Sequence, residues 1–120
     1  MTPHVGLYRW DELTLDKITE MVASKAITGA SATLTQSYFK KGAIVPRHTR
    51  ATEFFIYVLQ GAIRARVHGE DVTVREGNVV IVPAGVPHES EALDDTFVMT
   101  VAAALKAPDG IAPAADRLSV

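Results

Sequence analysis

Two histidines, His48 and His88, lie near the ends of strands and are the side chains best suited to proton transfer or metal binding. An imidazole changes charge near neutral pH and offers a ring nitrogen to a metal ion. Arg50 follows two residues after His48, and a guanidinium binds carboxylate or phosphate through two parallel N–H bonds. The chain has no cysteine, which excludes disulfides, thiolate chemistry and iron–sulfur clusters. Acid–base, anion-binding and imidazole–metal chemistry therefore stay open.

The two histidines lie in two glycine-bounded motifs, residues 42–61 and 77–92, which are separated by fifteen residues. Glycines at the motif ends permit the positive-φ turns that reverse strands in a small barrel. Pro83 lacks an amide donor and fits a strand end next to a turn. We therefore expect His48 and His88 to converge on one mouth of a barrel.

These motifs resemble the paired motifs of the cupin family. There the first motif reads Gly, five residues, His, one residue, His, three or four residues, Glu or Gln, six residues, Gly. The second reads Gly, five residues, Pro, one residue, Gly, two residues, His, three residues, Asn. The resemblance implies an all-β fold, a single small jelly-roll β-barrel. We expect an extended N-terminal segment at 1–30, the cupin barrel at 31–105 and a C-terminal tail at 106–120.

The resemblance also implies a metal site, in which a cupin supplies three His and one Glu or Gln to a divalent ion. His48 and His88 keep two of these positions, but Arg50 and Phe54 occupy the other two. Glu53 is adjacent, but strand alternation should point it away from Phe54. We therefore expect a divalent metal (Ni, Zn, Mn or Fe) to be absent or weakly bound, and we expect no organic cofactor. Other donors that could complete the set are Glu53, His68, Gln36 and Tyr38.

Two functions fit this degenerate ligand set. In the first, the barrel mouth binds a small anionic molecule, with a carboxylate on Arg50. The expected substrate-binding residues are Arg50, Phe54, Tyr38 and Gln36. In the second, the chain is an enzyme in which His48 or His88 shuttles a proton. The segment 83–96 is similar to small cupins of pectin and alginate breakdown, which convert unsaturated monouronates to linear keto acids. A dioxygenase ranks third, because it needs a firmly held metal.

Composition and strand signals agree with a small soluble domain. The 120 residues carry a net charge of −2, which gives no reason to expect nucleic acid or an anionic membrane as partner. No apolar run is long enough to span a bilayer, and we expect a cytoplasmic protein. Short β-branched and aromatic runs between glycine turns predict strands. They lie at 31–39, 54–59, 62–67, 72–74, 79–82 and 96–102, and 19–27 is favoured as an extended edge strand over a helix.

We also expect a homodimer. The segment 19–27 could add to a neighbouring subunit's sheet, although it could instead cover its own chain's sheet in a monomer. Phe55, Tyr57 and Leu59 alternate with Phe54, Ile56 and Val58. If one set lines the cavity, the other faces outward and needs cover.

Overall fold

The computed structural model describes residues 5–103, and in that range the chain folds into ten strands and one 3-10 turn. The expected C-terminal tail at 106–120 lies outside the described residues. The elements are η1 (Trp10–Glu12), β1 (Asp16–Lys17), β2 (Val22–Thr28), β3 (Ala32–Phe39), β4 (Ile44–His48), β5 (Phe54–Gln60), β6 (Ala62–Val67), β7 (Glu70–Arg75), β8 (Val79–Val82), β9 (His88–Ala92) and β10 (Thr96–Ala103).

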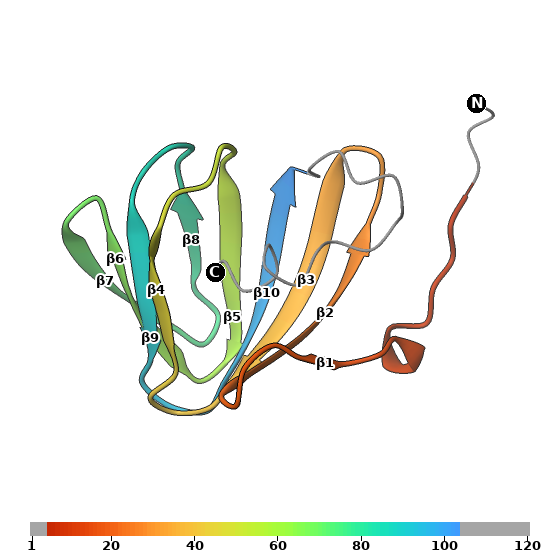
Figure 1. The fold of residues 1–120 in the computed structure, drawn as a ribbon, viewed down its shortest axis with the longest axis horizontal. Coiled ribbons are helices and arrows are strands. Elements are labelled where there is room, and N and C mark those ends of the chain that lie inside the picture. Colours follow the sequence, from red (N-terminus) through yellow and green to blue (C-terminus); the bar gives the residue numbers. More distant parts are fainter. Residues whose placement is uncertain (1–4, 104–120) are drawn as a thin grey trace.

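The strands form two antiparallel sheets that face each other (Figure 1). The larger sheet has the order β1-β2-β3-β10-β5-β8, and the smaller has the order β4-β9-β6-β7. The β3–β4 turn connects the larger sheet to the smaller one, and hydrogen bonds of Ala92 with Gly42 and Ala43 extend the pairing of β4 with β9 into this turn. The expectation of an all-β, jelly-roll barrel is confirmed.

Strand alternation places the core between the sheets. Along β5, Phe54, Ile56 and Val58 are fully buried, whereas Phe55, Tyr57 and Leu59 remain exposed. The inner set packs with apolar side chains of both sheets, since a period of two sends alternate residues to one face. The expected two-faced pattern of this strand is confirmed.

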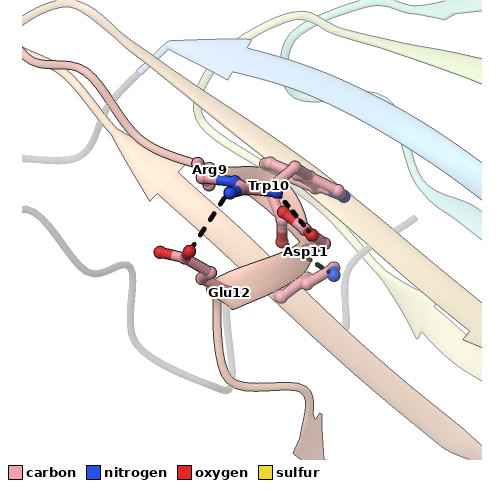
Figure 2. A network of polar contacts seen from close by, with 5 residues as sticks. Arg9, Trp10, Asp11 and Glu12 are labelled. Atoms are coloured by element: carbon pink, nitrogen blue, oxygen red, sulfur yellow. Dashed lines mark hydrogen bonds and ion pairs between the residues drawn. The ribbon is translucent and has the colours of Figure 1, made fainter.

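The N-terminal segment adds to the larger sheet of its own chain. The expected strand at 19–27 is present as β2, and all seven of its residues pair with β3. Before it, η1 docks on the outer face of this sheet: Trp10 Nε1 donates to Gln36 Oε1, and Lys25 Nζ donates to the Trp10 carbonyl at 2.9 Å. Figure 2 shows Arg9 reaching Asp11 and Glu12 across the same turn.

No helix within residues 5–103 is long and apolar enough to cross a membrane.

Candidate functional site

A β-bulge brings the two motif histidines side by side. Val45 of β4 pairs with Ser90 of β9, and the next pair is His48 with His88. Three residue steps on β4 therefore match two on β9, so one residue of β4 is extra. A regular strand would send residues three apart to opposite faces, whereas the extra residue lets both Val45 and His48 face inward. The bulge holds Pro46, which has no N–H to leave unpaired.

The two imidazole rings are held in the same manner. His48 Nδ1 lies 2.8 Å from the Pro46 carbonyl oxygen, and His88 Nδ1 lies 3.0 Å from that of Val86. A carbonyl only accepts, so each Nδ1 carries the hydrogen and donates it. The ring centroids are 4.1 Å apart, and both Nε2 atoms are buried without a hydrogen-bond partner. In the neutral form of either ring, Nε2 is an acceptor that no protein group uses.

Phe54 and Arg50 complete the surroundings of this pair. The Phe54 ring lies 5.0 Å from the His88 ring, and the Arg50 guanidinium carbon lies 5.4 Å from the Phe54 ring centroid. The Arg50 carbonyl also accepts the Gly85 N–H at 2.8 Å, which ties the loops of the two motifs together. Burial lowers the pKa of His88 below its usual value; the Val86 carbonyl acts in the opposite direction, and His48 and Arg50 lower the pKa further. His88 is therefore neutral at neutral pH.

The structure does not bring two of the expected substrate-binding residues to this site. On β3 the inward positions are Thr33, Thr35, Ser37 and Phe39, so Gln36 and Tyr38 lie on the outer face of the sheet. Gln36 accepts the hydrogen bond of Trp10, and the Tyr38 ring lies 4.7 Å from that of Phe97. The sequence carries no clear signal for the phase of this strand, because Tyr38 and Phe39 are adjacent aromatic residues on opposite faces.

The other candidate metal donors also lie apart. Glu53 is exposed just before β5, in agreement with the expected alternation. His68 is exposed in the β6–β7 turn at φ 51°, where it lines a pocket of about 450 Å³ on the rim of the barrel. His88 also borders that pocket, together with Arg47, Arg66, Gly69, Pro87 and Glu89.

The donor set does not make a complete metal site. The two Nε2 atoms have the orientation that imidazole ligands adopt when a carbonyl fixes the other ring nitrogen. Within the described part of the chain, however, no group of three or more His, Cys, Asp or Glu side chains could hold a metal ion. Protein metal sites usually supply three or four ligands. Arg50 adds a positive charge beside the pair, which opposes a dication.

Sequence reasoning missed two features of this site. Strands β4 and β9 were not expected, because Pro46 and the polar His88–Ala92 segment are poor strand formers. A bulge also has no reliable signature in one sequence. The inward serine and threonine side chains of β2, β3 and β10 were missed as well, although they share the alternation that identifies the core.

Comparison with known proteins agrees with this architecture. The family model described as "Cupin domain" matches residues 36–103, more than half of the chain. Among solved structures, KdgF from Halomonas sp. superposes with a TM-score of 0.79 at 19% identity, covering 88% of this chain and 98% of that one. An RmlC-like cupin from Shewanella frigidimarina gives 0.79 at 16% identity, with 90% and 98% covered.

A predicted oxalate decarboxylase from Thermotoga maritima superposes with a TM-score of 0.71 at 23% identity, covering 83% of this chain and all of that one (100%). At these identities the likeness is one of fold, because a single fold carries many chemistries.

Proposed function

Because the chain belongs to the cupin family, we propose that the mouth of its barrel binds a small carboxylate-bearing molecule, with Arg50 on the carboxylate and His48 and His88 beside it. The observation that carries the proposal is the pair of buried, unpartnered Nε2 atoms next to Arg50 and Phe54. These two unused acceptors lie beside a guanidinium, and together the three groups form a polar site for a ligand.

Each group has a distinct part in binding. The planar guanidinium of Arg50 matches a carboxylate bidentately. An imidazole that donates its Nδ1 hydrogen and is neutral accepts a hydrogen bond at Nε2, so this nitrogen suits a hydroxyl group of the ligand rather than its carboxylate. Phe54 is fully buried and covers one side of the His88 imidazole, and charge-assisted hydrogen bonds are stronger in such surroundings. The binding step requires no metal, since two imidazoles alone would hold Ni, Zn, Mn or Fe weakly.

A calorimetric titration with D-galacturonate and with the neutral sugar D-galactose tests this proposal. The acid should bind and galactose should bind at least about tenfold more weakly, because it lacks the group that Arg50 holds. Arg50→Gln should lower the affinity for the acid to the affinity that the wild type has for galactose. Arg75→Gln is the matched control, because Arg75 is exposed at the end of β7, away from the histidine pair, and should leave the affinity for the acid unchanged. Equal affinities for the acid and galactose would contradict the proposal.

An enzyme acting on an unsaturated uronate is the alternative, and the lowered pKa of His88 favours it. A neutral imidazole with a free Nε2 can take up a proton as a general base at neutral pH, and Arg50 would orient the substrate carboxylate. Loss of the absorbance of the conjugated unsaturated uronate measures this reaction. A rate above the spontaneous one that His88→Gln abolishes would establish the enzyme. A rate with wild-type protein that equals the spontaneous rate would leave binding as the function.

A further inference from the structure

A second pocket lies outside the barrel, on the outer face of the larger sheet. It encloses about 310 Å³ and is lined by Leu15, Lys25, Gln36, Tyr38 and Phe97. The strand register makes this lining continuous, because Lys25 of β2 pairs with Gln36 of β3, and Tyr38 of β3 pairs with Phe97 of β10. Leu15 adds a wall from the N-terminal segment, next to β1. This outer pocket has the size of a small-molecule site.

Two aromatic rings form much of the wall of the outer pocket. The ring centroids of Tyr38 and Phe97 lie 4.7 Å apart with the planes tilted by 34°, and both side chains are half-buried. Burial of their remaining apolar surface by a ligand is favourable. Aromatic rings also attract a further ring that packs on them offset or edge to face. The wall therefore favours a ligand with an aromatic ring.

Trp10 of η1 (Figure 2) orients the polar groups at one end of the outer pocket. Its indole N–H only donates, so the contact with Gln36 uses Oε1 and leaves the amide NH₂ group of Gln36 as a donor. Lys25 Nζ donates to the Trp10 carbonyl at 2.9 Å and lies 5.5 Å from the Trp10 ring centroid. An ammonium has three N–H bonds, so further ones remain after this contact. Among the described residues that line the pocket, Lys25 carries the only charge.

We propose that the outer pocket is a second binding site, which takes a small aromatic carboxylate. The ring of the ligand packs on Tyr38 and Phe97, and its carboxylate lies on Lys25 and Gln36. A carboxylate offers acceptors only, which match an ammonium and an amide NH₂ group. The site is separate from the barrel mouth, since Gln36 and Tyr38 lie on the face of β3 that points away from the interior.

Trp10 provides a local signal for the test, because it is the only tryptophan of the chain and its indole N–H donates to Gln36. Titration of isotope-labelled protein with benzoate should shift the indole N–H resonance to saturation. Benzamide, a planar molecule of similar shape without the charge, should bind about tenfold more weakly. Lys25→Met keeps an apolar side chain but removes the ammonium. It should weaken benzoate about tenfold and leave the affinity for benzamide unchanged.

Lys41→Met is the matched control, because Lys41 is exposed in the β3–β4 turn and the substitution removes the same charge. It should leave both affinities unchanged. Leu15→Ser should weaken both ligands, because Leu15 is 55% exposed and supplies an apolar wall rather than support for the core.

Three results would overturn the inference. They are an indole resonance that benzoate does not shift, equal affinities for benzoate and benzamide, and a Lys25→Met variant that binds benzoate as the wild type does. Loss of both ligands in Lys25→Met would likewise overturn it, since Lys25 would then only hold Trp10 in place. Arg50→Gln should leave the indole response unchanged. If Arg50→Gln alone abolished the response, benzoate would bind at the barrel mouth, which would support the proposed function and refute the outer pocket.

Discussion

At the residue scale, the backbone fixes which nitrogen of each histidine ring carries the hydrogen. Both rings donate Nδ1–H to the carbonyl two residues earlier in the chain, from Pro46 in one case and Val86 in the other. This common geometry leaves Nε2 as the functional atom of each ring. Sequence reasoning identified both histidines, because they fall on motif positions. It could not identify their hydrogen-bond partners, since these are backbone carbonyls that any residue supplies.

The lowered pKa of His88 predicts how stability depends on pH. The unfolded chain protonates this histidine at a higher pH than the folded chain does. The free energy of unfolding is therefore highest above the unfolded-state pKa and falls as the pH drops toward the folded-state pKa. Urea unfolding at pH 7.5 and pH 5.5 should show less stability at the lower pH for the wild type. His88→Gln should reduce this difference.

His68→Gln provides the control, because His68 is exposed in the β6–β7 turn. It should keep the pH dependence of the wild type. An equal dependence in wild type and His88→Gln would contradict the buried, neutral state of His88.

At the scale of the elements, most strands followed from the sequence and the site strands did not. β5, β6 and β10 are rich in β-branched or aromatic residues, and their expected bounds agree with the structure within one residue. β4 and β9 carry the histidines but have weak strand propensity, so only pairing with their neighbours makes them strands. Tertiary pairing overrides local preference at these two strands.

Gly61, in the turn between β5 and β6, packs directly against the backbone at the start of β10. It has φ +89°, and a Cβ added there would lie 2.5 Å from the Asp95 carbonyl oxygen and 2.5 Å from Thr96 Oγ1. Gly61→Ala should therefore lower the free energy of unfolding by more than about 3 kcal/mol, since backbone strain and a clash with the main chain add together. Equilibrium unfolding in urea measures this loss.

Gly77 is the matched control for this substitution. It has φ +83° but no atom within 4 Å of an added Cβ. Gly77→Ala should cost only the left-handed strain, about 1 kcal/mol. Equal losses for the two variants would show that conformation alone, and not the contact with the start of β10, requires glycine at position 61.

At the scale of the whole molecule, residues 5–103 leave one apolar surface of the larger sheet uncovered. The outer face of β8, β5 and β10 carries Val79, Ile81, Phe55, Tyr57 and Val101, and cross-strand pairing makes these positions contiguous. Their exposed fractions range from 38% for Phe55 to 55% for Val79. The expected pairing of segment 19–27 with a neighbouring subunit does not contribute to a dimer, because β2 pairs with β3 of its own chain. The case for a homodimer therefore rests on this face.

We expect two copies to pack these faces against each other about a two-fold axis, the commonest symmetry of soluble oligomers. Light scattering after size exclusion should give twice the 12.9 kDa of one chain. Tyr57→Lys should shift the mass toward the monomer, because it places a charge in the centre of the apolar face. Ile44→Lys is the control, since Ile44 is 64% exposed on the other sheet. A monomeric wild type, or a dimer that only Ile44→Lys disrupts, would refute this arrangement.

We expect Arg50 and the histidine pair to bind a carboxylate without help from a metal ion. A calorimetric titration of D-galacturonate into protein stripped of metal with a chelator tests it most directly. The acid should bind the stripped protein, and one equivalent of Ni²⁺ or Zn²⁺ should leave the affinity unchanged within about twofold. A stripped protein that binds no galacturonate, and regains binding when one equivalent of metal is added, would show that the metal ion holds the ligand.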